Sequence, residues 1–303
     1  MFLRELAAVK AKKQPKQIDD LTVNSPIFDT MDFFGSTHGL QHAYQELVSV
    51  TGGSLVGVDE PLPSADLTTK LNWKELGILG FNVEAGIDTV KTIAGDFPSY
   101  LAMKVPGITR KTSMDAEKSL IYDVLRLFAK KTSKLVSAYA GASGTDHYTL
   151  LAVRWEEGAL CGLYDENGFG QGAMLETIYL SGGNPYKNSA GKTVYGADFK
   201  SYLGFLTASE KNIAGIVNIN ASHKPTAAMI DDMLDECYAG TNGKTFIYGH
   251  PKALRMLSDI KGSAIQMSVN EKEYSRSLAK WDGIELVPSF NFDKGTEAAV
   301  SLS

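Results

Sequence analysis

The sequence predicts an α+β protein in which a long amphipathic helix lies on a β-sheet and a smaller α/β unit follows. Three observations predict this class. A helical apolar period runs through the middle of the chain, a strand period of two follows it, and helix and strand patterns alternate near the C-terminus. Irregular stretches precede these elements, so the chain also carries segments that have little means of burying themselves.

The first 84 residues predict an arm and a hairpin. The opening 20 residues read as a short amphipathic helix that ends before Pro15, and the turn-rich text from Asp19 to Tyr44 has no sustained period. From Ser49 to Glu84, glycines and two prolines separate short apolar pieces. This pattern predicts a long hairpin with a thin apolar face, which is marginal alone and needs a neighbour to lie on.

The clearest single element is a helix from Thr112 to about Leu135. Thr112 and Asp115 form a start signal, and the last turn is basic, as the helix dipole favours. An apolar stripe at helical spacing consists of Leu120, Ile121, Val124, Leu125 and Phe128. We expect this stripe to lie on a sheet formed by the strands between Tyr148 and Asn220.

The rest of the chain alternates between strand and helix patterns. The strands predicted for the sheet are Tyr148 to Trp155, Cys161 to Tyr164, Leu175 to Leu180, Lys192 to Leu206 and Ile213 to Asn220. An α/β unit then begins at Pro225 and Thr226 with a helix that bears Cys237, followed by the strand Thr245 to Tyr248 and a helix to Ile260. A final strand is expected from Ile284 to Val287.

Composition excludes several classes of protein. With 44% hydrophobic and 21% charged residues, the 303-residue chain can bury a large core, and no stretch approaches the roughly 20 apolar residues of a membrane span. The net charge of −5 and the scattered basic residues argue against a protein that reads nucleic-acid sequence. Cys161 and Cys237 lie far apart, so we expect two buried free thiols in a reducing compartment.

The usual catalytic motifs fail on spacing. Gly191-Lys192-Thr193 and Gly243-Lys244-Thr245 would need a glycine five residues upstream, where Tyr186 and Tyr238 stand, so neither is a phosphate loop. A nucleophile elbow at residues 52–56 fails because its last position is valine. The glycines of residues 168–172 fit turns between strands better than a dinucleotide site.

Metal sites have no better support. His38, His42 and Glu46 would share one face of a helix, but Gly35 and Gly39 weaken that helix. The acidic residues between Asp231 and Glu236 follow the outer face of an amphipathic helix. The sequence therefore predicts no catalytic, cofactor-binding or metal-ligating residue, and no cofactor.

One C-terminal stretch is specific enough to indicate a family. It runs from Thr245 to Pro251, through Leu254, Leu257 and a glycine stop at Gly262, to the strand of Trp281 to Val287. This order of strand, proline, helix, glycine and closing strand resembles the axial domain of the major capsid proteins of tailed bacteriophages, a fold shared with encapsulins. Upstream, Pro26 to Asp29, Asp59 to Pro63 and Val153 to Glu156 are similar to the podophage-type branch. His250 and Lys261 depart from the asparagine and aspartate that are common there.

The resemblance implies a four-part capsid fold. It divides the chain into an N-terminal arm (residues 1–48), an extended loop (49–84), a peripheral domain with a spine helix on an antiparallel sheet (85–220), and an axial α/β domain with a closing strand (221–303). The function it implies is structural: self-assembly into the pentamers and hexamers of an icosahedral shell around a double-stranded DNA genome.

The implied partners are other copies of the chain, a separate scaffolding protein, a portal and, through weak non-specific contacts, the packaged DNA. No membrane is involved. The implied location is the virion capsid, assembled in the cytoplasm of the bacterial host. Two alternatives stay open. One is an encapsulin-like compartment, and the other is a cytoplasmic hydrolase or transferase that uses the loop from Gly141 to Asp146.

Overall fold

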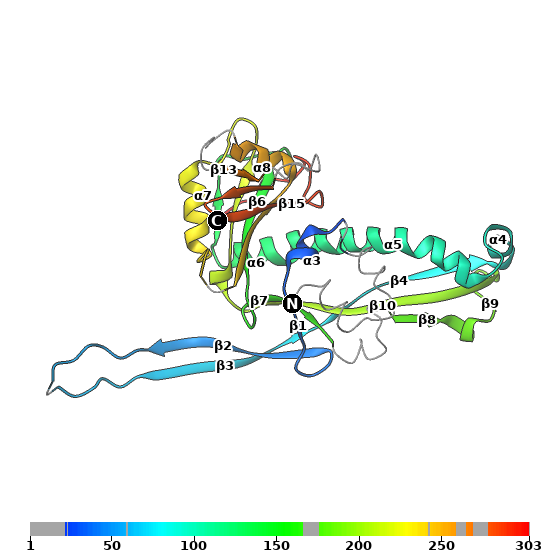
Figure 1. The fold of residues 1–303 in the computed structure, drawn as a ribbon, viewed down its shortest axis with the longest axis horizontal. Coiled ribbons are helices and arrows are strands. Elements are labelled where there is room, and N and C mark those ends of the chain that lie inside the picture. The colour runs from blue at the N-terminus through cyan, green and yellow to red at the C-terminus, as the bar shows by residue number, and fades with distance from the viewer. Residues whose placement is uncertain are drawn as a thin grey trace.

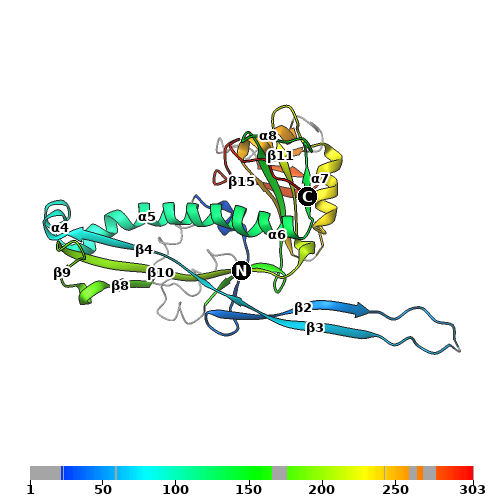
Figure 2. The same cartoon turned by 180° about the vertical axis from the view of Figure 1, so that it is seen from behind.

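The fold was analysed in a computed structural model that describes residues 22, 24–58, 60–165, 176–241, 243–258, 265–268 and 278–302. A long helix joins two sheets, one toward each of its ends, and a two-stranded ribbon projects away from both sheets (Figures 1 and 2). The expected helix in residues 1–20, the turns at 168–172, and the segments at 259–264 and 271–276 lie outside the described residues.

A six-stranded sheet supports the first half of the long helix. The strands β1 (Phe33–Gly35), β7 (Leu160–Tyr164), β10 (Thr193–Thr207) and β4 (Gly77–Gly86) lie in this order, and β8 (Glu176–Tyr179) and β9 (Tyr186–Lys187) also pair with β10. The arm enters this sheet through β1, which runs parallel to β7 with Phe33 opposite Gly162. A Cβ on Gly162 would lie 2.5 Å from the Phe33 ring, so only glycine allows this contact.

The spine of the molecule is one long helical element. It comprises α5 (Phe97–Ser119), the π-helical turn η1 (Leu120–Leu125) and α6 (Arg126–Lys131), and the short helix α4 (Ile87–Ile93) precedes it. The N-cap is Asp96, whose side chain accepts a hydrogen bond from the Ser99 backbone N–H at 2.7 Å. The predicted start at Thr112 is therefore wrong by about four turns. The predicted start signal at Thr112 lies inside α5, which begins at Phe97 and runs through Pro106. The helix extends this far because its buried stripe begins at Phe97.

The buried stripe of α5 repeats every four residues: Phe97, Leu101, Val105, Thr109, Ser113 and Glu117. Four residues exceed one turn by about 40°, so the stripe winds around the helix. Its N-terminal part faces β4 and β10, and its C-terminal part faces the arm helix α3 (Pro26–Thr30) and the C-terminal tail. One helix thereby joins parts of the chain that are far apart in sequence.

The second sheet has seven strands in the order β13 (Ile265–Ser268), β14 (Leu278–Trp281), β15 (Ile284–Pro288), β12 (Lys244–Gly249), β6 (Tyr148–Trp155), β11 (Ile213–Ile219) and β5 (Leu135–Ser137). The helices α7 (Ala227–Glu236) and α8 (Pro251–Ser258) pack on it, and the short 3-10 turns η2 (Leu180–Gly183) and η3 (Glu210–Asn212) flank β10. The strands predicted for residues 148–155, 245–248 and 284–287 are thus confirmed.

This seven-stranded sheet is a middle layer. Along β6, Leu150 and Ala152 belong to the core under α7 and α8, while Leu151 and Val153 belong to the core shared with the spine. The expectation that all strands from Tyr148 to Asn220 form one peripheral sheet is wrong, because β6 and β11 pair beside β12. Residues 148–155 and 213–219 therefore lie with the C-terminal unit rather than with the rest of residues 85–220.

The predicted spine stripe packs as a core, but on a different sheet. Leu120, Ile121 and Leu125 are each at most 1% exposed, while Val124 and Phe128 are only partly buried. They share a core with residues of β6 and β11, and α6 contacts β11 directly. The end of the spine therefore anchors the seven-stranded sheet, and its beginning lies on the six-stranded one.

Candidate assembly surfaces

The projecting ribbon consists of the strands β2 (Gln41–Thr51) and β3 (Asp66–Glu75). The ribbon begins at Gln41, eight residues before the predicted start of the extended loop at residue 49. The strands are antiparallel, with Gln41 opposite Glu75 and Thr51 opposite Asp66. Residues directly opposite each other in such a pair point to the same face. The register therefore assigns each residue to one of two faces.

One face of the ribbon is apolar. Ala43 lies opposite Trp73, Gln45 opposite Leu71 and Val50 opposite Leu67. The three apolar side chains of β3 share one side of the strand, with Thr69 between Leu71 and Leu67. The register shifts by one residue between Leu47 and Ser49. This bulge brings Val50 to the same face as Ala43, although the two positions differ in parity. The opposite face carries the polar pairs His42–Lys74, Glu46–Lys70, Ser49–Thr68 and Thr51–Asp66.

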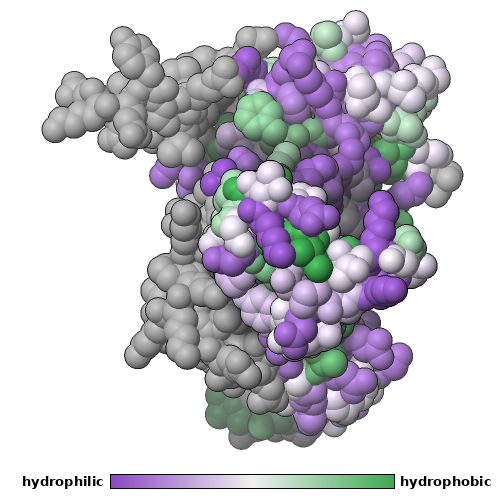
Figure 3. Space-filling model, turned by 90° about the vertical axis from the view of Figure 1, so that its right-hand side faces the viewer, coloured by the Kyte–Doolittle hydropathy of each residue, from purple (hydrophilic) through white to green (hydrophobic). Residues whose placement is uncertain are grey.

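The apolar face has no covering layer within the described part of the chain. Val50, Leu67, Leu71 and Trp73 are 58%, 62%, 56% and 50% exposed. At the tip, Leu55 and Val58 are fully exposed. By contrast, the surface at the α4 end is mostly hydrophilic, with hydrophobic side chains scattered among polar ones (Figure 3). A contiguous exposed apolar face on a soluble protein marks an interaction surface.

The base of the ribbon is fixed to the body. Tyr44 and Leu76 pack on a small core of Cys161, Leu163 and Leu206 in the six-stranded sheet. The Leu76 backbone N–H donates to the Leu40 carbonyl at 2.9 Å, and the Ala43 N–H donates to the Thr37 hydroxyl at 2.8 Å. The ribbon is therefore held in position at its base while its outer part lies in solvent.

A second feature is a buried carboxylate that joins arm, spine and tail. Glu117 is 0% exposed and accepts hydrogen bonds from the Ile27 backbone N–H at 2.9 Å, the Ser289 hydroxyl at 2.6 Å and the Asn291 amide at 2.9 Å. The Ser113 hydroxyl donates to the Ser25 hydroxyl at 2.7 Å one turn earlier. The spine therefore binds the arm helix and the C-terminal tail through polar contacts that exclude water.

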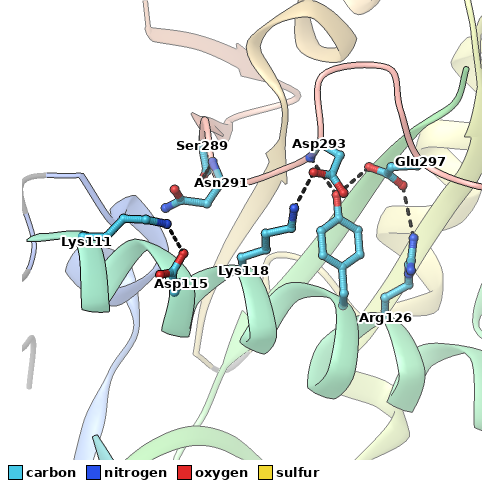
Figure 4. A network of polar contacts seen from close by, with 9 residues as sticks. Lys111, Asp115, Lys118, Arg126, Ser289, Asn291, Asp293 and Glu297 are labelled. Carbon is cyan, nitrogen blue, oxygen red and sulfur yellow. Dashed lines mark hydrogen bonds and ion pairs between the residues drawn. The ribbon is translucent and has the colours of Figure 1, made fainter. Parts of the chain in front are cut away.

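The C-terminal tail also contacts the spine through a second buried acidic residue, Glu297 (Figure 4). Glu297 is 4% exposed and accepts hydrogen bonds from the Tyr122 hydroxyl at 2.9 Å and the Arg126 guanidinium at 3.2 Å, and also from the Thr149 hydroxyl. Its backbone bridges to His147, and Lys118 pairs with Asp293 at 2.6 Å. Residues 289–297 thereby hold the spine and the seven-stranded sheet in one arrangement.

Burial raises the pKa of Glu117 above its ordinary value, although the donors from Ser289, Asn291 and the arm backbone oppose this shift. Burial likewise raises the pKa of Glu297 against the donors from Thr149, Tyr122 and Arg126. A carboxyl with a raised pKa binds protons more tightly in the folded state. Its contribution to stability is therefore largest below the ordinary value of 4.5 and decreases as the pH rises through the raised pKa.

We expect Glu117→Gln to reduce the dependence of the unfolding free energy on pH in this window. The substitution removes the titrating group but keeps its shape, so the loss of stability with rising pH should become shallower. Thermal unfolding of purified subunits across acidic to neutral pH measures this slope. Asp115→Asn, which removes an exposed and solvent-screened carboxyl from the same helix, serves as the control. An unchanged slope in Glu117→Gln would exclude this role for Glu117.

The glycine motifs considered as phosphate-binding loops lie in turns, and the histidines considered as metal ligands lie on or beside the ribbon. Gly191 lies in the turn before β10 and Gly243 in the turn before β12, and both have positive φ. His38 packs edge-on against Trp73 at 5.0 Å, and His42 lies on the polar face of the ribbon. No group of three potential metal ligands occurs among the described residues. The absence of a catalytic site stays a prediction.

The prediction of two buried free thiols is confirmed. Cys161 and Cys237 are free and buried, and burial raises their thiol pKa to about 12 and about 11. Asp232, Asp235 and Glu236 lie on the exposed side of α7, opposite the buried Met233 and Leu234, as predicted. Asp231 does not follow this face, because its carboxylate accepts a hydrogen bond from the indole N–H of the buried Trp281 at 2.9 Å. Within the described ranges, none of the helices is long and apolar enough to cross a membrane.

Sequence reasoning missed the two features that define these surfaces. The bulge in the ribbon could have been predicted, because the apolar residues of β2 stand at odd-numbered positions near Ala43 and at even-numbered positions near Val50. Glu117 also gave a signal, because it stands four residues before Ile121 in an otherwise uncharged stripe. Neither signal identifies the partner of the residue, which depends on contacts between distant segments.

No protein-family model matches the chain, and no curated protein matches it in sequence. Among solved structures, the chain is similar to a bacteriophage JBD30 capsid, with 8% identity, a TM-score of 0.54, and coverage of 95% of this chain and 98% of that chain. It is also similar to a structure of bacteriophage Epsilon15, with 13% identity, a TM-score of 0.53, and coverage of 90% and 88%. An encapsulin from Synechococcus elongatus covers 75% of this chain, with 10% identity and a TM-score of 0.46.

The likeness to the two phage chains extends over almost the whole chain. This confirms the predicted fold class: the chain has the α+β fold of tailed-phage capsid proteins.

Proposed function

We propose that this chain is the major capsid protein of a tailed bacteriophage, which self-assembles into the pentamers and hexamers of an icosahedral shell around double-stranded DNA. The observation that carries this proposal is the ribbon, whose apolar face has no covering layer in the described chain. The full-length likeness to a phage capsid chain supports it.

The ribbon supplies the interface. Because it projects away from both sheets, its own subunit leaves Leu67 and Leu71 more than half exposed and Trp73 half exposed, and a second copy is the proposed occupant (Figure 1). Full burial of one leucine side chain stabilises a contact by roughly 1.5 to 3 kcal/mol. A shell repeats this contact at every subunit, so a modest energy for each pair becomes a large energy for the particle.

The rest of the molecule provides rigid geometry. A contact between different patches on neighbouring copies closes into a ring when the rotation between subunits divides a full turn evenly, and gives an open helix otherwise, so ring formation requires a well-defined rotation. The ribbon is held at its base on the six-stranded sheet, and one core joins that sheet to the spine and to the seven-stranded sheet. Two carboxylate networks also bind the spine to the arm and to the C-terminal tail. In this proposal the seven-stranded sheet and its helices, corresponding to the axial domain, meet around the five-fold and six-fold axes.

The proposed partners follow from the same role. They are other copies of this chain, a separate scaffolding protein, a portal and, through weak and non-specific contacts, the packaged DNA. The net charge of −5 suits a wall that must not hold DNA tightly. The proposed location is the virion capsid after assembly in the bacterial cytoplasm.

Particle mass and content test this function together. We expect the purified native protein to sediment as particles many times heavier than the 32.8 kDa subunit and to protect double-stranded DNA from added nuclease. Particles that protect a protein cargo and no nucleic acid would contradict the genome-shell role and favour an encapsulin-like compartment. A protein that stays monomeric or dimeric under assembly conditions would favour the hydrolase or transferase alternative.

A further inference from the structure

The spine helix is a basic element in an acidic protein. Between residues 97 and 131 the spine has seven lysines and arginines against three acidic residues, while the whole chain has a net charge of −5. One of those acids, Glu117, is buried and bonded to arm and tail. The exposed surface of the spine therefore carries a clear excess of positive charge.

Three lysines form a row on this helix. Lys104, Lys111 and Lys118 are seven residues apart, and such positions share nearly one face because the helix drifts by only about 20° per seven residues. The row is about 21 Å long at 1.5 Å per residue. Figure 4 shows Lys111 and Lys118 rising from the same side of the helix, and all three are exposed.

The present contacts of the row are weak and exchangeable. Lys111 pairs with Asp115, but their side chains are 69% and 61% exposed. The Lys104 ammonium lies 5.9 Å from the centre of the Tyr100 ring. Lys118 contacts Asp293 and the Tyr122 ring, with its side chain 49% exposed. Exposed ion pairs contribute little net energy, so a polyanion can replace these partners at small cost.

We propose that this lysine row is the surface through which the shell contacts the phosphate backbone of double-stranded DNA. The inference rests on the proposed function and locates its DNA contact on the chain. An extended row of cations without a pocket fits a repeating line of phosphates rather than a small anion. Contacts of this kind carry no sequence information, which suits a wall that meets any part of a genome.

The acidic remainder of the chain limits the strength of this contact. Because the net charge is −5, the rest of the subunit repels the same polyanion. Binding should therefore be weak and strongly dependent on salt.

The test uses purified full-length subunits and a linear double-stranded DNA fragment of mixed sequence. Affinity is measured by fluorescence anisotropy over a range of salt concentrations. We expect Lys104→Gln with Lys111→Gln to weaken binding and to lower the slope of log affinity against log salt by about 0.9 for each lysine removed. Lys104→Arg with Lys111→Arg keeps the charges and should keep the slope.

Lys187→Gln with Lys192→Gln is the matched control. It removes the same charge from exposed positions outside the lysine row, one on β9 and one in the turn before β10, and should change the slope less. An equal loss in the control pair, or an unchanged slope in the spine pair, would overturn the assignment. Particle formation by the same variants reports on the proposed function separately. Shells from the spine pair would leave that function intact whatever the DNA result.

Discussion

Two lysines on the apolar face of the ribbon should abolish shell assembly without unfolding the subunit. We expect this of Leu67→Lys combined with Leu71→Lys. Both side chains are more than half exposed in the isolated chain, so the subunit itself loses little packing. In the assembled shell each lysine would place a charge where the account buries a leucine, which costs several kcal/mol at every interface. Thermal unfolding of subunits and electron microscopy of assembly reactions measure the two effects.

The opposite face of the same strand provides the control. Thr68→Lys with Asn72→Lys introduces the same two charges one position further along, where Ser49 and Tyr44 lie opposite. Lysine at position 72 can also pair with Glu46, which already accepts from the Asn72 amide at 2.5 Å. Near-normal shells are expected from this pair. If both pairs assembled equally well, or failed equally, the apolar face could not be the assembly interface.

The second large effect concerns the end of the spine. Leu125→Ala should destabilise the subunit by about 2 to 5 kcal/mol, because Leu125 is 1% exposed and its loss leaves a cavity between the spine and the seven-stranded sheet. Such a loss is a large part of the stability of a typical domain. We expect a subunit that aggregates or fails to assemble. Chemical denaturation of the purified subunit gives the magnitude.

Leu127→Ala removes the same atoms two residues further along. Leu127 is 43% exposed, so its removal should cost under about 1 kcal/mol. Both variants replace leucine with alanine in a helix, so the difference between their unfolding free energies reports the effect of burial alone. Equal destabilisation by the two substitutions would mean that the spine does not pack on the seven-stranded sheet through the stripe of Leu120, Ile121 and Leu125.

Much of the fold was predictable because strand and helix periods are local. The strand from Tyr148 to Trp155 was predicted with the bounds of β6, and the predicted strands for β7, β8, β10 and β11 differ from the structure by at most one residue at each end. The helix that begins after Thr226 was also predicted, since its acidic face and apolar face alternate at helical spacing.

The assignment of strands to sheets was not predictable from the same signals. β6 is buried on both faces, so its sequence lacks the alternation that tells which face meets which partner. The start of the spine was missed because Pro106 and Gly107 disfavour a helix locally. The helix continues there because Leu101, Val105 and Thr109 pack against the body of the protein, a long-range effect.

The surfaces proposed for function were predictable only in outline. A long hairpin that needs a neighbour was expected from its glycines and prolines, but the assignment of Leu71 and Val50 to one face depends on strand register and on a bulge. The carboxylate of Glu117 was not expected, because its donors come from residues 27, 289 and 291, which meet only in the folded chain.

Electron microscopy of the purified protein under assembly conditions tests the central claim most directly. The account predicts closed icosahedral particles of uniform diameter, with the ribbon of each subunit lying apolar face down on a neighbouring copy. Subunits that remain dispersed under all such conditions would contradict it, as would particles in which Leu67, Leu71 and Trp73 stay exposed to solvent.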